Sequence, residues 1–235
     1  MATKFPDKKT PVTKAEVISA LWQAWMCYFG EAPPHKECIW LLIAQWALET
    51  GWGASMHNYN MGNAKSQEGD GFDYQYFACW EILPIKQAES MAQSTPALVK
   101  ITKRRPDGMA VVWFQPEHPA CRFRAFGSLL EGAIDHIHLV ASRYRRAWPE
   151  ILKGDIDAYA RALKAQGYYT ADESLYAAGL RNCYNAIAKE PFDYASIPVM
   201  TDIEKSRLQN LVAQTIRTSV DDIMLRSRIV PDEDT

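Results

Sequence analysis

The segment 39–50 constrains the fold of this chain more than any other. Its apolar residues recur at helical spacing on nearly every side of a helix, through Trp46, until the glycine stop at Gly51. A helix that is apolar on all sides has to be covered by other elements, so we expect it at the centre of a helical core. It is interrupted by Gln45 and is too short to span a membrane, because a bilayer takes about 20 apolar residues.

Further helices are predicted where a capping residue precedes an apolar periodicity of helical spacing. A strand is predicted over 72–78, where aromatic residues alternate with polar ones. Two strands at 99–103 and 109–114 flank Pro106 and Gly108, which are placed as a hairpin turn requires. The sequence therefore predicts a mainly α protein of the α+β class, with further helices at 14–29, from 128, at 156–166, 172–189 and 201–225.

Composition excludes several other classes of protein and site. The 26 Lys and Arg against 28 Asp and Glu give a net charge of -2, so no global positive field draws the chain to nucleic acid. The 5 cysteines are widely spaced and form no Cys-x-x-Cys pair, which predicts reduced thiols rather than a disulfide framework or a zinc site. His136 and His138 would point to different faces of a helix, which argues against a metal pair.

Glu49 is the candidate catalytic residue. On a helix it lies one turn after Trp46, on a largely apolar stripe that ends just before Gly51. Apolar neighbours and the negative end of the helix dipole both favour the protonated carboxyl. A carboxyl that stays protonated near neutral pH is what a general acid for glycoside cleavage needs. Residue type and spacing alone also allow a surface glutamate in the last helical turn.

The run Leu-Glu-Thr-Gly-Trp-Gly at 48–53 resembles the Leu-Glu-Ser-Gly-Trp-Gly motif of bacterial and phage β-N-acetylglucosaminidases. This flagellar-hydrolase-like family has a lysozyme-like fold. Three more segments are similar to the family's motifs in the family's order: Asn-Tyr-Asn-Met-Gly at 58–62 with Lys65, Phe-Arg-Ala-Phe-Gly-Ser at 123–128, and Gln-Gly-Tyr-Tyr-Thr-Ala-Asp at 166–172.

The resemblance and the pattern of predicted elements together indicate how the chain is divided. A lysozyme-like domain is expected over 13–195, with a small β lobe in which 86–115 is an insertion relative to the family. A flexible N-terminus is expected over 1–12, and a helical extension with a disordered tail over 196–235.

The resemblance also implies an activity. The family hydrolyses the β-1,4 bond between N-acetylglucosamine and N-acetylmuramic acid in peptidoglycan without a cofactor or metal, and Glu49 would protonate the departing oxygen. Tyr168 matches the family's Gly-Tyr tyrosine and would line the cleft. Substrate contacts are also expected from Trp52, Asn60, Lys65 and Tyr169.

A second carboxylate would lie in the β region, where glycosidases place a partner for the acid. Glu81 ranks first, since its separation from the loop glycine is about that of the family's second acid, and Asp73 ranks second. Glu68 and Asp70 are the other carboxylates of this region. A mechanism that uses the substrate's own N-acetyl group would need none of them as nucleophile.

Two alternatives stay open within enzymes, a lytic transglycosylase and a muramidase of the same fold. A third is a catalytically inactive phage structural or glycan-binding protein. The N-terminus has no apolar core of a Sec signal, so we expect synthesis in the cytoplasm and delivery to the cell wall by holin release, a virion or a secretion machine. The amphipathic segment 201–225 would contact a second copy or a virion partner, or pack on its own domain.

Overall fold

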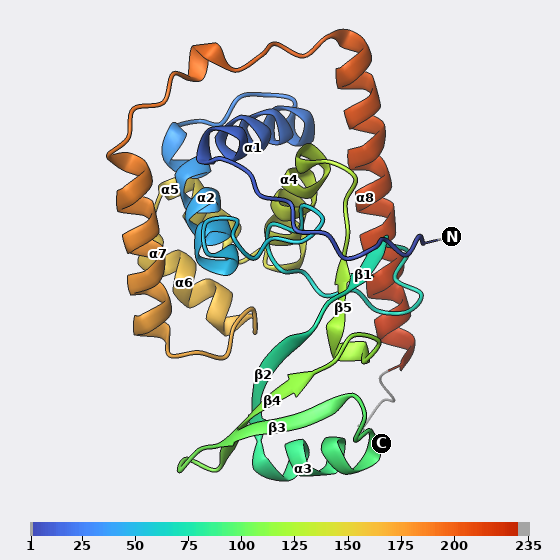
Figure 1. The fold of residues 1–235 in the computed structure, drawn as a ribbon. Coiled ribbons are helices and arrows are strands. Elements are labelled where there is room, and N and C mark those ends of the chain that lie inside the picture. Colours follow the sequence, from blue (N-terminus) through green and yellow to red (C-terminus); the bar gives the residue numbers. More distant parts are fainter. Residues whose placement is uncertain (1, 230–235) are drawn as a thin grey trace, which may run out of the picture.

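The structure is a computed structural model that describes residues 2–229, with side chains as far as residue 217. Helix α2 lies at the centre of a helical body (Figure 1) and packs against α1, α5 and α7. Nearly every residue from Cys38 to Ala47 is buried, as the apolar pattern predicts. The helical body consists of α1 (Lys14–Phe29), α2 (Lys36–Thr50), α4 (Leu129–His138), α5 (Trp148–Lys153), α6 (Ile156–Ala165) and α7 (Glu173–Ala188).

The predicted helix starts are confirmed by their caps. The Thr13 hydroxyl accepts the Glu16 N–H, and the Glu16 carboxylate accepts the Thr13 N–H at 2.7 Å, so both halves of a capping box form. The side chains of Ser128 and Asp172 cap α4 and α7 by accepting backbone N–H groups of the first helical turn. After α4 the chain continues through a π-helical turn, Leu139–Arg143, which leads into the site described below.

A small β lobe extends below the helical body (Figure 1) and has its own apolar core. Its sheet is antiparallel in the order β2-β4-β3, and a helix, α3, packs against it. A separate antiparallel pair, β1 with β5, joins the lobe to the helical body. The elements are β1 (Tyr74–Tyr76), β2 (Cys79–Pro84), α3 (Ile85–Ser94), β3 (Val99–Arg104), β4 (Met109–Phe114), a 3-10 turn (Pro119–Cys121) and β5 (Arg122–Arg124).

The expected hairpin is present as β3 and β4, joined by a tight turn. Arg105 donates its N–H to Met109 O, and Gly108 adopts the positive φ of 78° that the turn needs. Helix α3 is not predicted by the sequence analysis. It buries only Ala88 completely and has no side-chain N-cap, so neither signal used for the other helices marks it.

The strand predicted over 72–78 is wrong in extent and in orientation. Only Tyr74–Tyr76 forms a strand, and the residue it buries is Gln75 rather than its tyrosines. The Gln75 amide donates to His57 O and to Arg124 O and accepts from the Asn58 side chain. A fully satisfied buried amide therefore sets the face of this strand, which an apolar alternation does not reveal.

The N-terminal segment is held in place, where the sequence analysis expects a flexible one. Phe5 donates its N–H to Tyr74 O, and Lys8 O accepts from Asn58 N–H. Thr10 is buried and donates its N–H to Met56 O. These backbone bonds pair the segment with distant parts of the chain, a pairing that no local pattern encodes.

Helix α8 (Asp202–Ile229) runs along one side of the molecule (Figure 1) and packs on α1 and α4. Its start is the predicted capping box of Thr201 with Glu204. Leu208 and Val212 are buried in the main core, so this part of the helix packs on its own domain. The tail expected to be disordered lies outside the described residues. Within the described residues, no helix has the length and apolarity that a membrane span needs.

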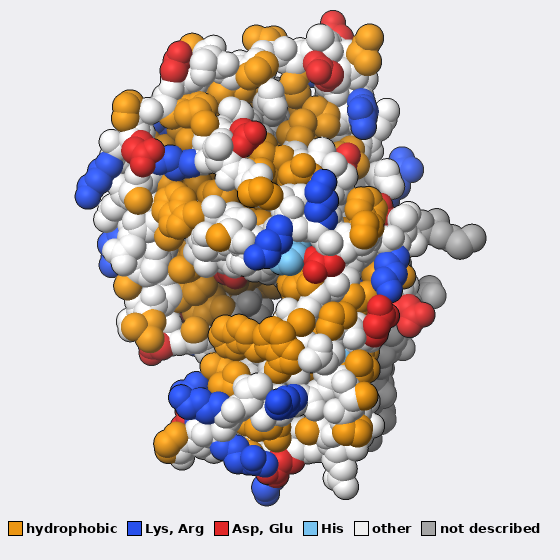
Figure 2. Space-filling view, in the orientation of Figure 1, with side chains coloured by type: hydrophobic (Ala, Val, Ile, Leu, Met, Phe, Trp, Pro, Cys, Tyr) orange, Lys and Arg blue, Asp and Glu red, His pale blue; other side chains and the backbone are white. Residues whose placement is uncertain are grey.

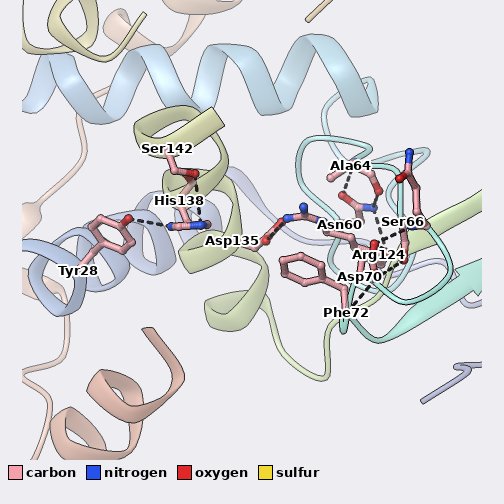
Figure 3. A network of polar contacts seen from close by, with 11 residues as sticks. Tyr28, Asn60, Ala64, Ser66, Asp70, Phe72, Arg124, Asp135, His138 and Ser142 are labelled. Carbon is pink, nitrogen blue, oxygen red and sulfur yellow. Dashed lines mark hydrogen bonds and ion pairs between the residues drawn. The ribbon is translucent and has the colours of Figure 1, made fainter. Parts of the chain in front are cut away.

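A buried ion pair fixes the loops near the lobe junction to the helical body (Figure 3). Arg124 Nη1 on β5 lies 2.6 Å from Asp135 Oδ1 on α4, and both side chains are about 5% exposed or less. Asn60 donates to Arg124 O and to Ala64 O, which shapes the loop that carries Lys65. The ion pair therefore helps to position one wall of the site.

Candidate active site

Glu49 lies in the last turn of α2, one residue before its end. Gly51 ends the helix in the left-handed region, with a φ of 57°, so the chain turns sharply just after the carboxyl. Glu49 is half-buried, and Tyr176 on α7 donates its hydroxyl to Glu49 Oε1 at 2.9 Å. The Asn63 side chain donates to Glu49 O at 2.7 Å and holds the following loop against the helix end.

Burial raises the pKa of the Glu49 carboxyl above its ordinary value of 4.5, while hydrogen bonds from Tyr176 and Tyr168 lower it by less. Burial also raises the pKa of both tyrosines, so their hydroxyls stay protonated as donors. The site thus favours a neutral Glu49 and surrounds it with groups that keep their protons.

The carboxyl opens onto a cleft of about 740 Å³ between the helical body and the β lobe. Figure 2 shows the surface hollowed between these two parts of the molecule. The helical body contributes the end of α2, the loop 62–65, and Arg143, Tyr144 and Tyr168. A volume of this size accommodates a short oligosaccharide or a ligand of similar size.

The β lobe brings a second carboxylate to the same cleft. Glu81 on β2 lines it and forms an ion pair with Lys65, whose Nζ lies 3.2 Å from Glu81 Oε1. Lys65 is fixed by Ala120 O, which accepts from Nζ at 2.6 Å, and its ammonium lies 3.9 Å from the centre of the Phe123 ring. Glu49 and Glu81 therefore reach one cleft from different lobes.

Aromatic rings form much of the remaining wall. His57, Phe77 and Phe123 are stacked, with ring centres 4.3 and 4.0 Å apart, and all three line the cleft. Trp80 lines it too and is 60% exposed. Flat rings of this kind pack against the apolar faces of sugars.

Four of the expected site residues lie in the cleft wall: Glu49, Lys65, Glu81 and Tyr168. The other four do not. Asp73 accepts a hydrogen bond from Thr3 N at 2.6 Å near the N-terminal segment, and Asn60 is buried within its own loop. Trp52 packs edge-on against Trp46, and Tyr169 stacks on Tyr176 and donates to Ala160 O.

Tyr176 is the residue that the sequence analysis missed and that contacts Glu49 directly. It lies 127 positions from Glu49 in the chain, and it follows the segment 166–172 that is similar to the family's motif. The only available signal is its helical position one turn after the N-cap Asp172, which becomes informative once α7 is known to pack on α2. Within the described residues, no cluster of three or more His, Cys, Asp or Glu is arranged to hold a metal ion.

A half-buried carboxyl with a raised pKa and a second carboxylate line one cleft, which fits the use of two carboxyl groups in glycoside cleavage. The family model described as "Glucosaminidase: Mannosyl-glycoprotein endo-beta-N-acetylglucosaminidase" matches residues 40–189, more than half of the chain. The chain belongs to this glucosaminidase family and is a glycoside hydrolase. The family expected from the motif at 48–53 is thereby confirmed.

One solved structure is similar, titled "Structure of a C-terminally truncated glycoside hydrolase domain from Salmonella typhimurium FlgJ". It shares 20% identity with a TM-score of 0.41, over 75% of this chain and 99% of that one. A comparison with curated proteins finds no match.

Proposed function

We propose that this chain hydrolyses the β-1,4 bond between N-acetylglucosamine and N-acetylmuramic acid in the glycan strands of peptidoglycan, with Glu49 as general acid. One observation carries the proposal: a carboxyl with a raised pKa opens onto a cleft that a second carboxylate also lines. Glycosidic oxygen is a poor leaving group until it is protonated, and a neutral Glu49 supplies that proton.

Glu81 is the second acid of the proposed mechanism. Positive charge develops at the sugar's anomeric carbon in an oxocarbenium-ion-like transition state, and a carboxylate on the β lobe stabilises it. Lys65 holds the Glu81 carboxylate in position through the ion pair and is itself fixed by Ala120 O. The stacked rings of His57, Phe77 and Phe123 support the sugars beside the two acids.

The products of digestion test the reaction. Purified peptidoglycan treated with the full chain is expected to release fragments whose new reducing end is N-acetylglucosamine, carrying the added water. Mass spectrometry of borohydride-reduced fragments identifies that end. Fragments ending in 1,6-anhydro-N-acetylmuramic acid would show a lytic transglycosylase instead. Reducing N-acetylmuramic acid would show a muramidase, and no cleavage would contradict the proposal.

Glu81→Gln is expected to slow cleavage by about 10²-fold or more, because it removes the negative charge that faces the developing cation. Asp73→Asn is the matched control, since it removes a carboxylate of the same region that lies outside the cleft. It is expected to change the rate less than about threefold, as a substitution remote from the transition state does. The release of soluble muropeptides over time measures both. Equal losses in the two variants would remove Glu81 from the mechanism.

A further inference from the structure

Two thiols meet where the β lobe joins the helical body. Cys79 begins β2, Cys121 directly precedes β5, and their Sγ atoms are 3.7 Å apart. The backbone keeps these segments together, because Phe77 donates its N–H to Cys121 O at 3.3 Å. All 5 cysteines lie in the described residues, and no other two of them come within hydrogen-bonding distance of each other.

The two thiols differ in the way that disulfide exchange requires. Cys79 lines the cleft, where its Sγ lies 3.7 Å from Lys65 Nζ. The hydrogen bond with Cys121 and the Lys65 charge lower the pKa of the Cys79 thiol, which favours Cys79 as the attacking thiolate. Cys121 is fully buried, and its hydrogen bond to Cys79, with burial, raises the pKa of its thiol.

We propose that Cys79 and Cys121 are an oxidation site, at which a small-molecule disulfide converts the pair into an intrachain disulfide. The Cys79 thiolate attacks one sulfur of that reagent, forms a mixed disulfide and expels the other half as a thiolate. Cys121 then loses its proton and attacks the Cys79 sulfur, which expels the second half. Two electrons pass from Cys79 and Cys121 to the small-molecule disulfide. The reagent is thereby reduced to two free thiol molecules.

The geometry requires only a small movement. The sulfurs need to approach by about 1.7 Å, from 3.7 Å to the ~2.05 Å of a disulfide. The setting rests on the proposed function: peptidoglycan lies outside the reducing cytoplasm, in compartments where disulfides form and persist.

The bond would close the chain around the β lobe. The loop from 79 to 121 contains β2, α3, β3 and β4, and so the whole second core and Glu81. Closing a loop of this length restricts the unfolded chain and stabilises the fold. It would tie the base of β2 to the 3-10 turn beside Lys65, next to the cleft.

Counting thiols in the full chain tests the site. The reduced protein is incubated with oxidised glutathione, and free thiols are then titrated in denaturant. We expect the count to fall from 5 to three, with a disulfide-linked peptide pair containing Cys79 and Cys121 in the digest. The melting temperature is expected to rise by about 5–10 °C. A count that stays at five, or a linkage between other cysteines, would overturn the proposal.

Three variants separate this pair from general thiol oxidation. Cys121→Ser is expected to gain one glutathione at Cys79 and form no intrachain bond, and Cys79→Ser is expected to keep its remaining thiols. Cys183→Ser, a half-buried cysteine away from the pair, is the matched control and still loses two thiols. None of these readouts involves glycan cleavage, so a chain that failed to cleave peptidoglycan would still show whether the disulfide forms.

Discussion

Glu49→Gln is expected to lower the rate of glycan cleavage by about 10²–10⁴-fold, the contribution of a positioned general acid. Glutamine keeps the shape and can still accept the hydrogen bond from Tyr176, which reaches Glu49 Oε1 at 2.9 Å, but it has no proton to give. The initial rate of muropeptide release from purified peptidoglycan measures the effect. A variant that is folded and cleaves at the rate of the parent protein would refute the assignment of Glu49.

The pH dependence of the parent protein follows from the same residue. Glu49 acts in its protonated form, so activity is expected to fall as pH rises through the folded-state pKa. Burial raises that pKa above the ordinary 4.5, which extends the active form to higher pH. A rate that falls with a midpoint at or below 4.5 would show that the carboxyl is not held neutral in the cleft.

The thermal stability of the Glu49→Gln variant shows whether a loss of activity could come from unfolding. Because the folded-state pKa of Glu49 is raised, the unfolded chain ionises first as pH rises through 4.5, and stability is lost from there up to the folded-state pKa. Glutamine cannot ionise, so the variant is expected to be at least as stable as the parent protein at pH 7. Thermal unfolding at pH 7 and below 4 measures this, and the gain should disappear at the lower pH.

Arg124→Met is expected to destabilise the fold by about 3–5 kcal/mol, because it leaves the Asp135 carboxylate buried without its partner. The two side chains are 5% and 4% exposed, and their contact is 2.6 Å. For a chain of this length the loss corresponds to a fall in melting temperature of about 10 °C. Differential scanning calorimetry measures it.

The matched control is Arg104→Met, which breaks an ion pair with Glu89 on the exposed face of the β lobe. Those side chains are 60% and 50% exposed, so the pair is expected to contribute about 0–1 kcal/mol. The double variant Arg124→Met with Asp135→Leu should recover part of the lost stability, since it leaves no unpaired buried charge. Equal effects of Arg124→Met and Arg104→Met would contradict this account of the lobe junction.

Much of the fold follows from local signals in the sequence. The capping pair of Thr13 with Glu16, the apolar run of α2 and the turn at Gly108 each encode their structure within a few residues. The same is true of the position of Glu49, because an acid on an apolar helix stripe just before a glycine can be recognised in the sequence. Helix α3 escapes this kind of analysis because it buries a single residue completely.

Contacts between segments that are far apart in the chain cannot be predicted from such local signals. Gln75 is buried because its amide bonds to residues of two other segments, and the N-terminal segment is ordered because it pairs with residues about 50–70 positions away. Asp73 and Glu81 are both candidates for the second acid in the sequence, but only Glu81 on β2 lines the cleft, while Asp73 accepts a hydrogen bond from Thr3 N near the N-terminal segment.

The sequence by itself determined the central helix, the starts of the capped helices and the carboxyl that belongs to the glucosaminidase motif, since periodicity, caps and motifs act over a few neighbouring residues. Only the tertiary structure decided which groups surround that carboxyl: Tyr176 from α7, Glu81 and Lys65 at the cleft wall, and the pair of thiols beside them. The packing of α7 on α2 and the placement of the β lobe create those neighbours. Burial by the same packing raises the pKa of Glu49.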